Sequence, residues 1–376
     1  MIYQTEDDDE EEGEEYGWMD LPEILLEDIF CLLTPKYRHY ASQVCRRWYE
    51  TFYAPRVWET FVLNSVTLTK RRFNIFKGYQ RELCPRKTQV CLSRVGHLFK
   101  KIIINPLSDY YNLYEFLRIL ASFLGYFDEY PMPLLHTLDF TFACETRGIS
   151  GVIVHGTGGK ILEELKILLA NLKHLKRLKL SQLLLDESEV SGLLEAVQQH
   201  NVDSLKILEI VNCTKGPYML MEISNFNCLA KLVTSPQHIS DETVVMIAGS
   251  GITELHIIQD TYTCEAEPVT ADAWKLCKEM APYLRVVLKL CGRTKEELLL
   301  QPHAPVHEIH LETPYSKITV PVVISIVHFY HRHLEVFAQK CLPRVHGSRS
   351  FHERADSALV MLVRNCDETS ILNCER

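Results

Sequence analysis

A glycine-rich segment at residues 148–160 is the first place where this chain could do chemistry, because glycine-rich loops bind phosphate groups. A phosphate loop needs a serine or threonine after its lysine, but Lys160 is followed by Ile161. It also needs a glycine five residues before Gly159, where this chain has Val154. We therefore interpret these glycines as a flexible insertion, with a nucleotide-binding enzyme as the alternative.

Three histidines near the C-terminal end could bind a metal ion together with Cys341. They are His328, His331 and His333, and this spacing does not place them on one face of a helix. The sequence contains no H-E-x-x-H motif, no C-x-x-C pair and no G-x-S-x-G motif. We therefore predict no catalytic residue, no metal site and no cofactor, and we expect a protein that is not an enzyme.

Negative charge is concentrated at the N-terminus, where residues 6–15 hold nine carboxylates in ten positions. The whole chain has 40 basic and 49 acidic residues, so the remainder is formally neutral. Such a run repels itself, and we predict that residues 1–17 form a disordered acidic tail. A solubilising role is the favoured interpretation, and docking to a basic partner is the alternative. The neutral remainder argues against a nucleic-acid-binding protein.

Cysteine usage and hydropathy limit where the protein works. The thirteen cysteines are scattered and odd in number, which favours free thiols in a reducing compartment, the cytoplasm or the nucleus. No run of eighteen apolar residues occurs, so no membrane segment is predicted. The acidic N-terminus has no apolar stretch, so no secretory signal is expected.

Directly after the acidic run, residues 18–61 predict three short helices. Asp20 and Glu23 have the spacing of a capping box, and Pro35 follows a threonine at a second helix start. A third helix is predicted by apolar residues that recur at steps of four, Val44, Trp48 and Phe52. The first helix carries more apolar side chains than one stripe, and so small a unit cannot bury them alone. We therefore predict that a partner protein covers them.

This segment resembles an F-box. Leu21-Pro22, the ILLEDIF run at 24–30 and the VCRRW run at 44–48 match the family in order and spacing, whereas residues 34–41 lack the acidic residue common near Tyr37. F-boxes dock on the Skp1 adaptor of SCF-type cullin–RING ubiquitin ligases. The resemblance implies a surface that contacts Skp1 or directly supports that contact, formed by Leu21, Pro22, Ile24, Leu25, Ile29, Phe30, Val44, Cys45 and Trp48. A helical hairpin packed on the rest of the protein is the alternative.

Residues 62–98 connect this segment to the remainder and mix basic with aromatic side chains. The basic residues are Lys70, Arg71, Arg72, Lys77, Arg81, Arg86 and Lys87, and the aromatic ones are Phe73, Phe76 and Tyr79. Aromatic rings can stack on nucleic-acid bases while arginine binds phosphate. We instead predict a basic amphipathic linker helix docked on the first repeat, and no nucleic-acid partner.

Residues 99–376 repeat the pattern L-x-x-L-x-L, which predicts parallel strands of a leucine-rich-repeat solenoid. The clear copies are Leu135-Leu138-Phe140, Leu175-Leu178-Leu180, Leu205-Leu208-Ile210, Ile252-Leu255-Ile257 and Val306-Ile309-Leu311. Asparagine or cysteine usually closes each turn, but this position reads Ala143, Leu183, Cys213, Gln237, Asp260 and Pro314. The predicted fold class is α/β, a three-helix F-box followed by an irregular solenoid with its strands on the concave face. An ordinary α/β domain with parallel strands is the alternative.

An F-box followed by divergent repeats resembles the F-box/leucine-rich-repeat substrate receptors, including the F-box only protein 33 and 39 type. The resemblance implies a non-catalytic subunit whose repeats recruit an unidentified protein for ubiquitination. Side chains between the leucines alternate outward along each strand. The predicted substrate face comprises Arg177, Lys179, Lys206, Glu209, Glu254, His256, Glu308 and His310. A scaffold that works outside any ligase is the alternative function.

Overall fold

The computed structural model describes residues 21–76, 78–126, 129–142, 145–148, 151–190, 192–315, 319–340, 355–366 and 370–373. The chain separates into two compact units, Met1–Glu59 and Thr60–Arg376, and each is described by itself. The predicted acidic tail at residues 1–17 lies outside the described residues.

The described part of the first unit contains four helices, α1 (Glu23–Leu32), α2 (Pro35–Ala41), α3 (Arg46–Phe52) and α4 (Pro55–Trp58). Two of them begin at a proline, whose missing N–H is not needed in a first turn. The prediction for the third helix was wrong at its start, because Cys45 is extended at the N-cap and Val44 precedes the helix. The third helix ends at Phe52, and Pro55 begins the short helix α4.

The second unit is built on one sheet of eleven strands, in which every neighbouring pair is parallel. The strands lie in chain order, so each one pairs with the next strand of the sheet. They are β1 (Thr60–Leu63), β4 (Lys101–Ile104), β5 (Thr137–Thr141), β8 (Arg177–Ser181), β9 (Ile207–Val211), β10 (Lys231–Thr234), β11 (Glu254–Gln259), β12 (Arg285–Cys291), β13 (Val306–Glu312), β14 (Val336–Gln339) and β15 (Ser370–Asn373).

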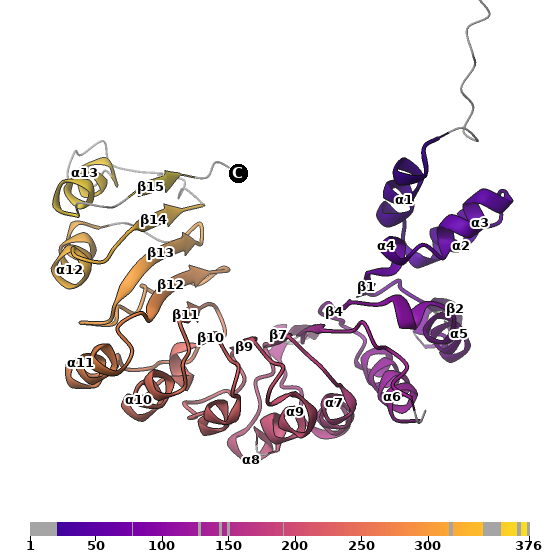
Figure 1. The fold of residues 1–376 in the computed structure, drawn as a ribbon, viewed down its shortest axis with the longest axis horizontal. Coiled ribbons are helices and arrows are strands. Elements are labelled where there is room, and N and C mark those ends of the chain that lie inside the picture. Colours follow the sequence, from indigo (N-terminus) through magenta and orange to yellow (C-terminus); the bar gives the residue numbers. More distant parts are fainter. Residues whose placement is uncertain are drawn as a thin grey trace, which may run out of the picture. The chain divides into compact units, whose positions relative to one another are not determined.

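Parallel neighbours need crossover connections, and helices supply most of them. These helices lie on one face of the sheet (Figure 1), and among the described residues no helix covers the other face. They are α5 (Pro85–Val95), α6 (Tyr110–Tyr126), α7 (Gly159–Asn171), α8 (Glu187–Val190), α9 (Leu193–Asn201), α10 (Asp241–Gly249), α11 (Ala271–Met280), α12 (Val320–Tyr330) and α13 (Ala355–Asn365). Short 3-10 turns complete the connections, η1 (Gly96–Leu98), η2 (Met221–Asn225) and η3 (Pro236–His238). The mixed α/β class predicted from the sequence is confirmed.

The leucine pattern becomes a row of buried side chains that crosses the sheet. Five residues in register on neighbouring strands are fully buried between sheet and helices, Leu138, Leu178, Leu208, Leu232 and Leu255. Burying such a side chain stabilises the fold by about 1.5–3 kcal/mol. The row shifts at β13, where a β-bulge between Val286 and Val287 places Ile309 opposite Leu288.

Residues 62–98 do not form the single linker helix that the sequence predicted. They contain the end of β1, an antiparallel hairpin of β2 (Thr69–Asn74) and β3 (Gly78–Leu83), and then α5. Phe73 pairs with Tyr79 across the hairpin, so these two rings lie on the same face of it. Gly78 adopts a positive φ of 68° at the turn, which favours glycine.

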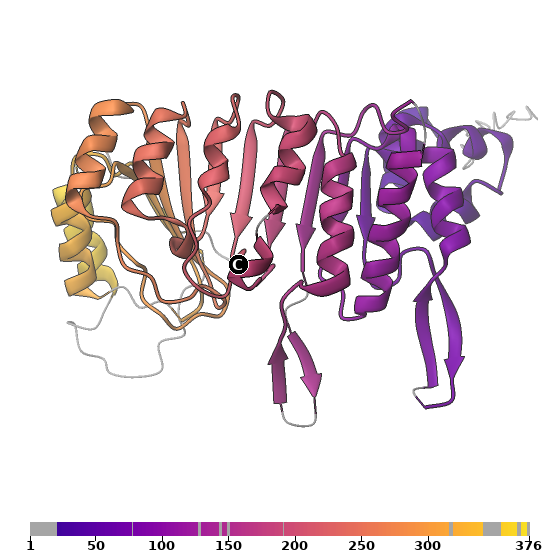
Figure 2. The same ribbon diagram turned by 90° about the horizontal axis from the view of Figure 1, so that it is seen from below.

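A second hairpin, β6 (Glu145–Gly148) with β7 (Gly151–Val154), follows β5. Both hairpins therefore emerge at the carboxyl-terminal edge of the sheet, and Figure 2 shows them projecting on the same side. Neither hairpin pairs with the large sheet.

Candidate functional site

The first unit has a small core built from α1, α3 and α4. Phe30 of α1 is fully buried, and the edge of the Trp48 ring packs on it with the ring centroids 5.9 Å apart. Trp58 of α4 is also buried, and its indole N–H donates to the carbonyl of Phe52 at 2.6 Å. These aromatic contacts fix the three helices around a core that includes Leu26.

A buried arginine that was not predicted from the sequence joins α2 to the end of α1. The guanidinium of Arg38 donates to the carbonyls of Phe30 at 2.9 Å and Cys31 at 3.1 Å. A cation at a helix C-terminus is favoured by the helix dipole. The same guanidinium lies 4.8 Å from the centre of the Trp58 ring. No sequence pattern distinguishes this arginine from exposed neighbours, because its burial depends on how the helices cross.

Apolar side chains remain uncovered on the outside of this unit. Leu25 keeps 47% of its surface exposed and Val44 keeps 63%, and Ile24 is exposed beside them. Leu32 is 88% exposed and lies seven residues after Leu25, so both share one face of α1. The heptad spacing could have identified Leu32 from the sequence. Several exposed large apolar side chains on so small a unit are typical of an interaction site.

The nine residues predicted to serve this surface divide by burial. Pro22, Ile24, Leu25 and Val44 are exposed, whereas Leu21, Ile29, Cys45 and Trp48 are half-buried and Phe30 is fully buried. Phe30 is therefore positioned to support the surface from within and cannot contact a partner directly.

Seven of the eight residues predicted for the substrate face lie on the strands of the second unit. Most of them are joined by ion pairs or hydrogen bonds across neighbouring positions. Arg177 pairs with Glu209, Lys179 with Asp139 at 3.8 Å, Lys231 with Glu254 at 2.8 Å, and the ring of His310 contacts Glu308 at 2.9 Å. The sheet face that no described helix covers therefore carries acidic and basic side chains that pair with one another.

Lys206 is the exception among the eight. It precedes β9, and the position in register with Arg177 is Ile207. Residues 208 and 210 are buried, so the alternation along the strand directs 207 and 209 toward the opposite face. The L-x-x-L-x-L pattern has two residues between its first leucines, and the alternation assigns the outward position to the second of them, which is Ile207 here.

The charges on this sheet face shift one another's pKa values. A hydrogen bond from Lys231 lowers the pKa of Glu254. Burial lowers the pKa of His256, Lys231 lowers it further, and these effects outweigh the nearby Glu254. His256 is therefore neutral at neutral pH, and its 3.3 Å contact with Glu254 is a hydrogen bond between a neutral ring and a carboxylate.

A buried polar network closes the turns at the carboxyl ends of β8 to β11. The amide of Asn212 donates to Asp260 at 2.7 Å and to Gln182 at 3.1 Å, and Gln182 donates to Asp260 at 2.7 Å. Ser235 and Thr263 donate to the side-chain oxygen of Asn212. The sequence pattern predicts the turn asparagine or cysteine one residue later, at Cys213, so Asn212 was not expected, although Asp260 is among the predicted turn positions.

Close packing explains the glycine-rich segment. A Cβ on Gly156 would lie 2.3 Å from the carbonyl oxygen of Leu184, and one on Gly158 would lie 2.4 Å from a carboxylate oxygen of Glu189. Gly158 is the N-cap of α7, so a negative group already lies where a phosphate would have to bind. Part of the segment, residues 149–150, lies outside the described residues.

The remaining sequence candidates add no site. Within the described ranges, no group of three or more His, Cys, Asp or Glu could hold a metal ion. His328 lies on α12 and His331 and His333 follow it, while Cys341 lies outside the described residues. Among the helices that the structure describes, none has the length and apolarity needed to cross a bilayer.

Comparison with known families bears on the first unit. Residues 18–60 match the family model of the F-box domain. A search of curated proteins found no match to the chain. The predicted F-box resemblance is therefore confirmed for residues 18–60, which form an F-box domain.

Proposed function

We propose that this chain is a substrate-recognition subunit of an SCF-type ubiquitin ligase, in which the F-box docks on Skp1 and the second unit recruits a protein target. The match of residues 18–60 to the F-box domain carries this proposal. The uncovered apolar residues of that domain support it, because a protein that removes Leu25, Leu32 and Val44 from water would stabilise the complex.

The second unit suits the recruiting role. Its strand–helix units stack along one direction, and we infer that they form an irregular leucine-rich-repeat solenoid whose uncovered sheet face is concave. Ion-paired residues on that face, such as Arg177 and Glu209, would give specificity for a partner of complementary charge. The contribution to ubiquitination is proximity, which raises the local concentration of target lysines without bond chemistry of its own. This role belongs in the cytoplasm or the nucleus.

Capture of purified Skp1 by the full chain tests the adaptor role. Leu25→Asp places a charge in the proposed interface, and we expect capture to fall by about tenfold or more, because interface anchors dominate affinity. Ile167→Asp on α7 is the matched control, since its exposed fraction of 49% equals that of Leu25 within two points. Phe30→Ala is unsuitable as an interface test, because it opens a cavity in the F-box core.

Undiminished capture by Leu25→Asp would contradict the assigned surface, and undiminished capture after deletion of residues 18–61 would contradict the adaptor role itself. Recruitment is tested separately. A partner retained by the chain without the F-box should be ubiquitinated in a reconstituted ligase only when the F-box is restored. Equal modification without the F-box would favour a scaffold that works outside the ligase.

A further inference from the structure

The β2–β3 hairpin is anchored at its base and exposed beyond it. Asn112 of α6 accepts the Leu83 N–H at 2.8 Å and donates to the Arg81 carbonyl at 3.0 Å. Leu83 is buried there, whereas Ile75 and Phe76 at the tip are largely exposed. Because a two-stranded ribbon has little core of its own, its outer side chains do not serve the stability of the fold.

The strand register sorts these side chains into two faces. Arg71 lies directly opposite Arg81, and Phe73 lies directly opposite Tyr79. These four residues are called the Arg71 face. Two like charges at opposed positions destabilise a hairpin, so this arrangement needs a reason outside the hairpin. The two rings pack edge to face with their centroids 5.2 Å apart, and Phe73 remains 61% exposed and Tyr79 78% exposed.

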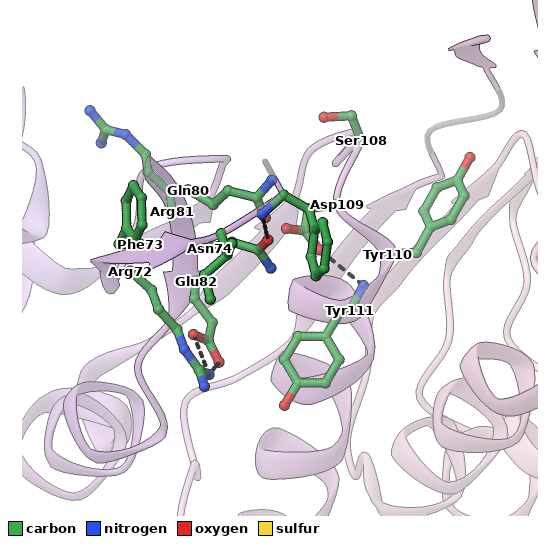
Figure 3. Close-up of a pocket in the computed structure, with 12 residues that line it drawn as sticks. Arg72, Phe73, Asn74, Gln80, Arg81, Glu82, Ser108, Asp109, Tyr110 and Tyr111 are labelled. Atoms are coloured by element: carbon green, nitrogen blue, oxygen red, sulfur yellow. Dashed lines mark hydrogen bonds and ion pairs between the residues drawn. The ribbon is translucent and has the colours of Figure 1, made fainter. Parts of the chain in front are cut away.

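On the opposite face of the same hairpin, a carboxylate balances the positive charge. Arg72 contacts both carboxylate oxygens of Glu82 at 3.0 Å, and Glu82 lies opposite Lys70. This face borders a cavity of about 830 Å³ that residues 108–111, which include the start of α6, complete. Figure 3 shows the Arg72–Glu82 pair on the side of Tyr111, while the Arg81 side chain is directed away from it. Within the described residues, no carboxylate pairs with Arg71 or Arg81.

We propose that the Arg71 face is a docking surface for an acidic segment of a partner protein, with carboxylates at the two guanidinium groups and an apolar side chain on Phe73 and Tyr79. Guanidinium groups bind carboxylates in a paired geometry, and a ligand that bridges them removes the repulsion between Arg71 and Arg81. The exposed rings beside them supply apolar contact area. This proposal is independent of Skp1 binding.

A nucleic acid fits this face less well. Binding a phosphate backbone requires many neutralised charges, but the Arg71 face offers two guanidinium groups, and Arg72 is already paired. Successive bases need separate ring faces on which to stack, whereas Phe73 and Tyr79 pack edge to face against each other. Nucleic-acid binding is therefore an outcome that the experiment distinguishes.

The test is fluorescence anisotropy with the full chain and three labelled probes. The first is a short peptide of glutamate and phenylalanine, the second has glutamine at every glutamate, and the third is an oligouridylate of equal charge. We expect the acidic peptide to bind most tightly. The double substitution Arg71→Gln and Arg81→Gln should weaken binding of the acidic peptide by about tenfold or more, because two charge-assisted contacts are lost. The double substitution Phe73→Ser and Tyr79→Ser should also weaken binding of this peptide.

The matched control removes the same charge from the other face. The double substitution Lys70→Gln and Arg72→Gln should weaken binding of the acidic peptide by less than about threefold, because only the long-range electrostatic field changes. Thermal unfolding of both double variants checks that the hairpin remains folded. The proposal is overturned by an equal loss in the two double variants, by equal binding of the glutamine peptide, or by no binding of the acidic peptide. Tighter binding of the oligouridylate with the same dependence on Arg71 would assign the face to nucleic acid instead.

Discussion

His238 shows how a single side chain couples this fold to pH. Its Nε2 accepts the N–H of Cys213 at 3.1 Å, so the ring proton must be on Nδ1, which donates to the carbonyl of Tyr218 at 3.0 Å. Burial lowers the pKa of His238 to about 4, although the bond to Tyr218 opposes that shift. The ring is a neutral structural link between the turns after β9 and β10.

The free energy of unfolding should therefore depend on pH through His238. The folded pKa of about 4 lies below the ordinary 6.5, so the unfolded chain takes up a proton first. This contribution to stability is full above about pH 6.5 and falls by about 3 kcal/mol as the pH approaches 4. Urea unfolding of the native chain and His238→Gln across this range measures it. Equal pH dependence in both proteins would contradict the assignment.

The sequence could not predict which individual side chains of the site are exposed and which are buried. Leu25 and Phe30 belong to the same apolar run, yet one is exposed and the other is fully buried. Periodicity relates positions on one helix to each other, but the crossing of α1 with α3 and α4 decides which of them face outward. For the same reason Arg38 was missed, since its burial depends on the approach of Trp58.

Among the elements, the β2–β3 hairpin differs most from expectation. The sequence predicted a helix because basic and aromatic residues were read as a helical face. Instead, Phe73 lies opposite Tyr79 on two antiparallel strands, and Gly78 supplies the turn. A short strand pair without an apolar alternation gives a weak signal, and its position depends on the distant Asn112.

Asn112→Ala should loosen this hairpin without unfolding the sheet. The substitution leaves the Leu83 N–H and the Arg81 carbonyl without their partner, at a cost of about 1–3 kcal/mol. Amide hydrogen exchange should accelerate in β3 and remain unchanged in β9. Asn227→Ala is the control, because its bond to Asp203 is exposed at the surface. Unchanged exchange in β3 would show that Asn112 does not hold the hairpin.

At the scale of the whole molecule, the leucine pattern carried most of the fold. It located β5, β8, β9, β11 and β13 because each strand buries the same two or three positions. It did not reveal the bulge between β12 and β13 or the strand β15, which follow from pairing rather than from local composition. The solenoid class remains a proposal, whereas the parallel order of the strands is a feature of the structure.

A core substitution should act on neighbouring strands before distant ones. Leu208→Ala removes a fully buried side chain from β9 and should cost about 2–5 kcal/mol. In a stack where each unit contacts its neighbours, amide hydrogen exchange should accelerate first in β8 and β10, and the exchange rates in β4 and β13 should change little. Ile167→Ala at an exposed position is the control. A uniform rise across all strands would indicate a single cooperative block.

The two hairpins leave the strand ladder undisturbed. β1 pairs with β4 and β5 pairs with β8 in full register, although β2–β3 and β6–β7 are inserted between them. A longer, shorter or exchanged hairpin would therefore change what the carboxyl-terminal edge presents without moving any strand. The frame is tolerant of grafting at these two places, and new binding properties could be installed there by transplanting a ribbon from another protein.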